Sequence, residues 1–273
     1  MNEIVTEKSG LSNLQCLTGS TLKFLGVIMM VFDHLHQMFF MFGVPDWFTW
    51  IGRLVAPIFL FMCAEGFRHT RSKARYMLLL FVGFEFMNVA SDLLAKAMPS
   101  EQVVLMNNIF GTLLLCTIYM WGVDALCGGI REKKPAKAAL SVLVMLAPIA
   151  VGVVFVVMLG SEAFLSNPFA RNIVSLLRFV PNLAIAEGGP PLVLLGLLFY
   201  LLRRWRLAQV AALVAMGLLT LFLVGGAQWM MLFAAVPILL YGGARGKGSK
   251  YFFYIFYPAH IYAFYAITCL MAQ

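Results

Sequence analysis

The chain has 273 residues, of which 62% are hydrophobic and only 12% are charged, and its mean hydropathy is +0.89. Soluble domains average about 45–50% apolar and about 25% charged residues, so this composition excludes an ordinary soluble protein. It predicts an all-α fold, a polytopic bundle of membrane-spanning helices within a lipid bilayer. The formal net charge of +8 could indicate a nucleic-acid partner, but the positions of the basic residues give another explanation below.

Apolar runs of about 20 residues, separated by short polar breaks, predict about nine spans, with a range of eight to ten. The runs are 22–42, 49–67, 76–95, 103–126, 137–159, 189–202, 207–224, 229–242 and 251–271. The range reflects the short run at 189–202 and the ambiguous stretch 163–188. Residues 1–20 are polar and lack a cleavable signal pattern, so we expect a cytosolic N-terminal segment followed by one transmembrane domain, 21–273.

The lysines and arginines gather in alternate breaks between the spans. Of the 20 such residues, 14 lie in the breaks at 68–75, 131–137, 203–206 and 245–250. The breaks between these, at 43–48, 96–102, 160–172 and 225–228, contain only Lys96 and Arg171. This is the positive-inside pattern, which predicts that the N-terminus is inside and the C-terminus outside. It explains the positive charge without a nucleic-acid partner.

The five cysteines form no CxxC pair and show no regular spacing. The sequence therefore predicts neither a disulfide framework nor a metal site.

Ionisable and amide side chains occur near the middle of several predicted spans. Asp33 and His34 lie midway along the first span, Glu85 and Asn88 midway along the third, and His260 midway along the last. Such groups usually face the interior of a bundle and mark a functional path. Two interpretations are open: a proton relay in a transporter, or an enzyme in which an imidazole with a pKa of about 6.5 acts as a general base.

The helical geometry of the first span separates its polar residues. Adjacent positions point about 100° apart, so we expect Asp33 to contact a neighbouring helix, through Arg53, and not to pair with His34. His36 points in a third direction and is expected to pack or to lie at a pore mouth. Lys23 precedes His34 by about three turns and shares its face. A basic entrance that leads to a buried base suits an anionic donor from the cytosol.

The first basic loop, GFRHTRSKARY (66–76), is a second candidate for anion binding. Its residues Arg68, His69, Arg71, Lys73 and Arg75 could hold phosphates, or they could serve only as topology signals. Glu65 and His69 are one turn apart, so their side chains are expected to lie on one face.

The stretch FVPNLAIAEGGPP (179–191) cannot form an uninterrupted helix because it contains three prolines and two glycines. It predicts either a broken segment that carries Glu187 into the bundle or a plain outer loop. In the first case Glu187, with Glu85 and Asn88, would lie on the acceptor side of a site.

Three segments carry a resemblance to a known family: LKFLGVIMMVFDH (22–34), IGRLVAPIFLFMCAEGFRHTRSKARY (51–76) and PILLYGGARGKGSKYFFYIFYPAHIY (237–262). They resemble the TraX family, which is associated with N-acetylation of F-type pilin subunits. The resemblance covers most of the chain, from Lys23 to about Tyr262. The first two spans are also similar to the wider transmembrane acyltransferase superfamily, in which a basic residue, ten positions and a His form a recurring motif.

The resemblance implies an enzyme of the bacterial inner membrane that transfers an acetyl group from cytosolic acetyl-CoA to an amine, the N-terminus of a pilin-like peptide. It implies that His34 is the catalytic base. Asp33 and Arg53 would hold the geometry, and His260 would polarise the thioester or position the acceptor. Lys23, Arg68, His69, Arg71 and Arg75 would bind the donor. The alternatives are a proton-coupled transporter and an O-acyltransferase that acts on a glycan.

Overall fold

The computed structural model describes residues 15–248 and 251–272, except for the side chain of Ala163. In the described residues the helices are α1 (Gly19–Phe39), η2 (Phe40–Phe42), α2 (Trp47–Gly52), α3 (Val55–His69), α4 (Lys73–Ala97), α5 (Ile109–Arg131), α6 (Pro135–Leu159), α7 (Glu162–Ser166), α8 (Pro168–Leu177), α9 (Gly189–Leu201), α10 (Arg206–Leu223), η3 (Gln228–Ala234), α11 (Ala235–Leu239) and α12 (Phe252–Met271).

Seven helical segments in the described residues are long and apolar enough to cross a membrane, and two shorter apolar helices, Gly189–Leu201 and Gln228–Leu239, accompany them. The prediction of an all-α polytopic membrane bundle is therefore confirmed. The fourth span begins at Ile109 and not at residue 103, because 103–108 are non-helical. The ambiguous stretch contains the short helices α7 and α8. Most of the predicted 1–20 segment lies outside the described residues, and α1 already begins at Gly19.

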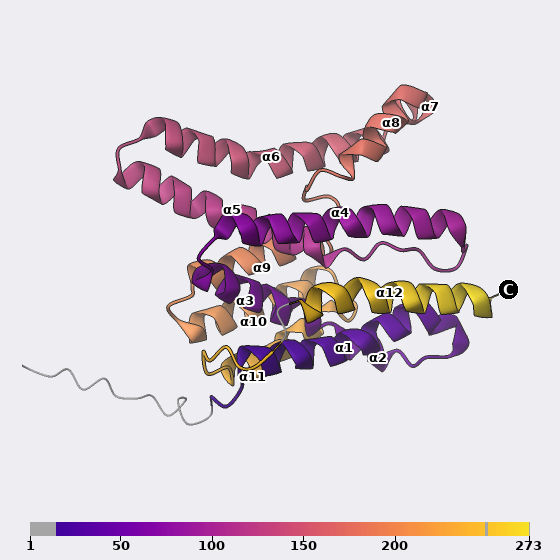
Figure 1. Cartoon of the computed structure of the whole chain (residues 1–273), viewed down its shortest axis with the longest axis horizontal. Coiled ribbons are helices and arrows are strands. Elements are labelled where there is room, and N and C mark those ends of the chain that lie inside the picture. The colour runs from indigo at the N-terminus through magenta and orange to yellow at the C-terminus, as the bar shows by residue number, and fades with distance from the viewer. Residues whose placement is uncertain (1–14, 249–250, 273) are drawn as a thin grey trace, which may run out of the picture.

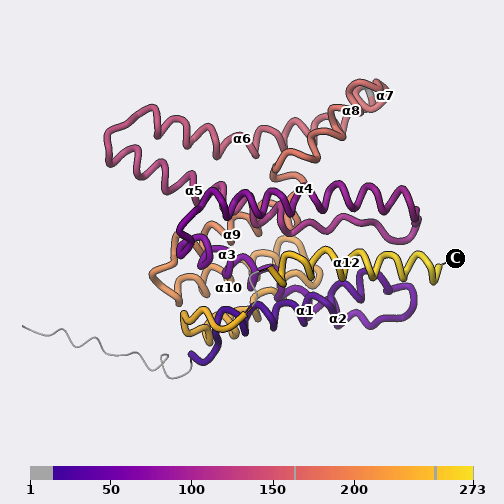
Figure 2. Tube along the Cα trace, in the orientation of Figure 1, coloured from indigo at the N-terminus to yellow at the C-terminus, as the bar shows by residue number. Residues whose placement is uncertain are grey.

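The helices run roughly along one axis, with α1, α12 and α4 side by side (Figure 1). The same view shows α6 at one edge of the bundle, packed on α5. The tube in Figure 2 shows the turns α3–α4, α5–α6 and α9–α10, and the segment that leads into α12, at one end of the bundle. These four turns are the basic breaks of the sequence. Contacts such as that of the Arg68 Nη1 with the carbonyl oxygen of Arg203, at 3.3 Å, connect them.

The second span is broken between α2 and α3. Pro57 lacks the N–H that would bond to the carbonyl of Arg53, and its ring would collide with that carbonyl in a continuous helix. The turn at Arg53 and Leu54 therefore interrupts the helix and carries the guanidinium into the bundle. Gly52, at the break, allows α1 to approach closely, since a Cβ there would lie 2.0 Å from Asp33 Oδ1.

Residues 178–188 are non-helical and enter the bundle before α9 begins. Asn182 is fully buried and Ala186 is nearly so. The hydroxyl of Thr112, on α5, donates to the carbonyl oxygen of Glu187 at 3.0 Å. Gly188 and Gly189 have φ values of 75° and 68°, which favour glycine. Of the two predictions for this stretch, the broken segment is confirmed and the plain outer loop is wrong.

Candidate active site

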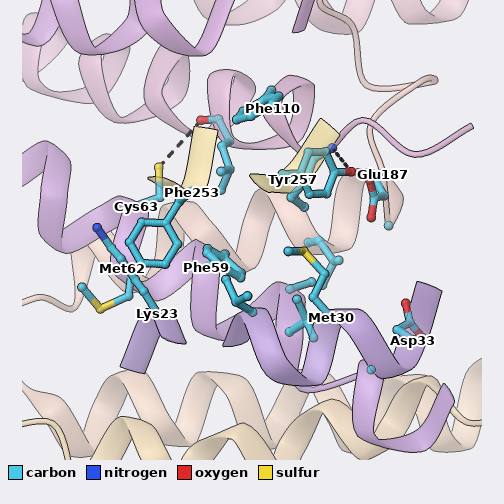
Figure 3. Close-up of a pocket in the computed structure, with 18 of the residues that line it drawn as sticks. Lys23, Met30, Asp33, Phe59, Met62, Cys63, Phe110, Glu187, Phe253 and Tyr257 are labelled. Carbon is cyan, nitrogen blue, oxygen red and sulfur yellow. Dashed lines mark hydrogen bonds between the residues drawn. The ribbon is translucent and has the colours of Figure 1, made fainter. Parts of the chain in front are cut away.

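A cavity of about 180 Å³ lies between α1, α3, α5, α12 and the segment that leads into α9. Its walls are mostly apolar side chains, such as those of Met30, Phe59 and Phe110. Figure 3 shows Lys23 and Cys63 at one end, and Asp33 and Glu187 at the other. His34, Arg53, Gln228 and Tyr257 also line the cavity. The first and last spans therefore meet around one space, as an enzyme site or a transport path requires.

The central polar contact joins His34 of α1 to His260 of α12. His34 is 2% exposed, and its Nδ1 lies 2.7 Å from Nε2 of His260. Nδ1 of His260 lies 2.7 Å from the carbonyl oxygen of Phe256. A carbonyl can only accept, so Nδ1 of a neutral His260 carries the proton and its Nε2 accepts from Nδ1–H of His34. The chain of bonds leaves the lone pair of His34 on Nε2, the arrangement that a general base needs.

Asn107 lies beside this lone pair. Its amide nitrogen is 3.4 Å from Nε2 of His34 and 2.9 Å from Oε1 of Gln37. The first distance is longer than a normal hydrogen bond, so the contact is weak and the lone pair stays available for a proton. Oδ1 of Asn107 is buried and has no hydrogen-bond partner among the described residues.

Asp33 and Arg53 form the ion pair that the sequence predicts between neighbouring helices. Nη2 of Arg53 lies 3.3 Å from Oδ1 of Asp33. Nη1 of Arg53 donates to Oε1 of Gln228 at 3.2 Å, and its Nε donates to the carbonyl oxygen of Thr49 at 3.3 Å. The guanidinium thus joins α1, the α2–α3 break and η3. Its fixed geometry suits a group that positions a site.

Two hydrogen bonds hold the Glu187 side chain, and both are made to the same carboxylate oxygen. Its Oε2 accepts from the backbone N–H of Asn108 at 2.9 Å and from the hydroxyl of Tyr257 at 3.1 Å. The Tyr257 hydroxyl in turn accepts from the backbone N–H of Ile109 at 3.1 Å. The rings of Tyr257 and His34 are in an edge contact, with 6.1 Å between their centroids. Tyr257 therefore connects the carboxylate to the histidine pair.

The family of the chain is identified by its similarity to known proteins. The model of the TraX protein family matches residues 18–268. The chain belongs to the TraX family. No curated protein and no solved structure gives a significant match. The matched region contains the whole histidine pair and every residue that lines the cavity of this TraX-family chain.

The residues that the TraX resemblance assigns to the donor divide into three groups. Lys23 lines the cavity, and its Nζ lies 5.5 Å from the ring centroid of Phe253. Arg71 and Arg75 line a second hollow of about 220 Å³. Tyr76 lines both this hollow and the cavity and so lies between them.

Arg68 and His69 line neither space. Arg68 bonds to the backbone of Arg203, as described above, and Nδ1 of His69 lies 2.9 Å from the carbonyl oxygen of Glu65. Glu65 and His69 are thus neighbours on one face, as expected, but through a backbone group. The geometry gives these two positions no contact with either candidate donor space.

The three residues expected on the acceptor side are also separated. Glu187 lines the cavity. Asn88 lies outside it and accepts from Nδ2 of Asn108 at 3.0 Å. Glu85 lies outside it too, and its Oε1 is buried with no partner in the part of the chain that the structure describes. His36 contacts Asp46 at 3.0 Å and Thr49 at 2.8 Å, in agreement with a packing role away from the site.

Four residues near the site were missed at the sequence level: Asn107, Tyr257, Gln228 and Arg245. The charge of Arg245, in the basic segment before α12, interacts with that of Lys23. The only sequence signal for Tyr257 was its place in FYPAH, one turn before Ile261. Among the described residues, no group of three or more His, Cys, Asp or Glu side chains is placed to hold a metal ion.

Proposed function

We propose that this TraX-family protein transfers an acetyl group from acetyl-CoA to an amine, and that the acceptor is the N-terminus of a pilin-like peptide. Membership of the family supports the acceptor, since TraX is known for N-acetylation of F-pilin. The geometry supports the chemistry. The observation that carries the proposal is the His34–His260–Phe256 chain of bonds, which leaves Nε2 unprotonated on a histidine that lines the cavity.

The reaction has one covalent exchange. The nitrogen of a neutral amine attacks the thioester carbonyl carbon and forms a C–N bond. Nε2 of His34 takes the proton that the amine loses, and His260 accepts the hydrogen bond from Nδ1–H of the resulting imidazolium. The C–S bond then breaks, and His34 returns the proton to the thiolate of CoA. The products are an amide and free CoA thiol.

The ends of the cavity suit the two substrates. Coenzyme A carries phosphates and a long, uncharged pantetheine arm. Arg71 and Arg75 in the second hollow would hold phosphates, and Lys23, with Arg245 near it, would attract them to the mouth of the cavity. The apolar walls would then accommodate the arm as far as His34, about 16 Å from Lys23 along α1.

The same proposal fixes the orientation in the bacterial inner membrane. Acetyl-CoA is a cytosolic metabolite, so the basic end of the bundle faces the cytosol. The N-terminus is then inside and the C-terminus outside, as the charge pattern predicts. The acceptor arrives from the membrane or the outer side.

The test is acetyl transfer by purified protein in detergent or proteoliposomes. Isotopically labelled acetyl-CoA is mixed with a synthetic peptide that has a pilin-like apolar N-terminal sequence. Mass spectrometry should find one labelled acetyl group on the α-amine, and a thiol assay should find one CoA released per peptide modified.

Two results would contradict the proposal. Proton-driven uptake of a solute, with no binding of CoA, would indicate a transporter. Acetylation of a sugar hydroxyl in preference to the amine would indicate an O-acyltransferase. The His34→Ala variant serves as the inactive control for the chemical step.

A further inference from the structure

The cavity separates its charges. Lys23 lies at one end, while Asp33 and Glu187 lie at the other, on different elements (Figure 3). The carboxylate end also contains one guanidinium, that of Arg53, which is paired with Asp33. With both acids ionised, this end has a net charge of −1 and would bind one further cation. An anionic donor is favoured at the opposite end.

Each carboxylate has one oxygen held by the protein and one that is not. Asp33 Oδ1 contacts Arg53, and Glu187 Oε2 accepts from Asn108 and Tyr257. Asp33 Oδ2 and Glu187 Oε1 have no hydrogen-bond partner within residues 15–248 and 251–272. Both residues line the cavity and are partly exposed, so these two oxygens are open to donors from a bound ligand.

Glu187 lies in a non-helical segment of the bundle. Residues 178–188 are non-helical inside the bundle, and Gly188, directly after Glu187, has a left-handed backbone conformation. The carboxylate accepts from Asn108, the residue before α5, and from Tyr257 of α12. The backbone carbonyl of Glu187 accepts from Thr112 of α5. Together these contacts fix the position of the Glu187 side chain at the cavity, as a binding group requires.

We propose that Asp33 and Glu187 form a subsite for the protonated amine of the acceptor, next to the histidine pair. The subsite rests on the proposed function and specifies its substrate as a cationic amine, not a neutral hydroxyl. An ammonium group has three donors and a positive charge, which match two free carboxylate oxygens. Glu187 Oε1 takes one proton from the bound ammonium and releases it to solvent. The neutral amine then attacks, and its second proton passes to His34.

The test compares two acceptors that differ at one atom: a peptide with a free α-amine and the same peptide with an α-hydroxyl. In Glu187→Gln the KM for the amine should rise about ten- to hundredfold, the range expected for the loss of a charge-assisted hydrogen bond. The kcat for the amine should also fall, because the Gln amide cannot take the ammonium proton. The KM for acetyl-CoA and that for the hydroxyl peptide should stay within about twofold of the wild-type values. Glu85→Gln removes another mid-span carboxylate, outside the cavity, and should change neither KM.

A binding measurement separates the subsite from the chemistry. In a His34→Ala background, calorimetry should detect binding of the amine peptide. Adding Glu187→Gln should raise the Kd of that binding by about ten- to hundredfold, as for the KM. If transfer is never observed but this difference is found, the subsite stands and the proposed reaction fails. If transfer occurs and Glu187→Gln leaves the KM for the amine unchanged, the subsite is overturned. Should Glu187→Gln fail to fold, Asp33→Asn carries the same comparison, because an amide oxygen can still accept from Arg53.

Discussion

Nδ1 of His34 lies 2.7 Å from Nε2 of His260, although the two residues are 226 positions apart in the chain. The contact joins α1 and α12, the first and the last described helix, which lie side by side. Because the carbonyl oxygen of Phe256 holds Nδ1 of His260, both imidazoles are restricted to one neutral tautomer. His34 is thereby the only member of the pair with a free basic nitrogen.

His34→Ala should therefore reduce kcat for acetyl transfer by about 10²–10⁴, the usual effect of losing a general base. His36→Ala is the matched control, because His36 is only half a turn away yet contacts Asp46 and Thr49. It should retain most of the activity. Both variants should still bind acetyl-CoA in a filter or calorimetric assay. Equal losses of kcat in the two would show that His34 has no special role.

His260 acts through His34, so its replacement should change kcat more than KM. His260→Phe leaves Nδ1–H of His34 without an acceptor, and an unsatisfied buried donor costs about 1–3 kcal/mol. We expect kcat to fall about ten- to hundredfold, with a changed pH profile. His260→Gln supplies a side-chain oxygen that can accept the bond and should restore part of the loss. The same low kcat in both variants would argue against positioning by a hydrogen bond.

Gly52→Ala should destabilise the protein, because the new Cβ would lie 2.0 Å from Asp33 Oδ1. Such overpacking typically lowers the free energy of unfolding by about 1–3 kcal/mol. Gly66→Ala is the control in the same predicted span, since the nearest atom to its new Cβ is 3.4 Å away. Thermal unfolding in detergent should show a lower Tm for Gly52→Ala and an unchanged or slightly higher Tm for Gly66→Ala. A normal Tm for Gly52→Ala would contradict the close approach of α1 to the helix break.

Replacement of both Arg71 and Arg75 by Ala should weaken binding of acetyl-CoA and reduce its dependence on salt. Both side chains line the second hollow, and phosphate contacts made by surface charges are screened as the ionic strength rises. The pair Lys133 and Lys134 provides the control, because its replacement by Ala removes the same charge from another basic turn. If both double variants lose affinity equally, the loss comes from the lower net positive charge and not from specific contacts in the second hollow.

The basic turns should be inaccessible from outside the cell. Cysteines placed at Ser72 and Ala136 should not react with a membrane-impermeant thiol reagent in intact cells, whereas one at Ser100 should react. The native exposed cysteines, Cys16 and Cys127, are first replaced by Ser to remove background labelling. Labelling of Ser72→Cys or Ala136→Cys in intact cells would reverse the orientation and, with it, the cytosolic donor side.

The sequence alone determined the fold class, because apolar runs of this length have only one stable arrangement in a bilayer. It also indicated the pairing of Asp33 with Arg53 and the shared face of Lys23 and His34, since helical periodicity fixes which positions can meet. The break at 179–191 was visible from its glycines and prolines. These features all depend on local chain geometry or on composition.

The tertiary structure alone decided which polar residues meet. Helical periodicity gives the direction of a side chain on its own helix, but not which helix faces it, so the contact between His34 and His260 was not predictable. For the same reason the sequence could not exclude Glu85 from the cavity, or Arg68 and His69 from both candidate donor spaces. Neither Tyr257 nor Asn107 could be singled out from the sequence, because a Tyr or an Asn near an apolar run is ordinary. Their importance comes from hydrogen bonds to Glu187 and His34. These partners are far apart in the sequence, and only the packing of the helices brings them together.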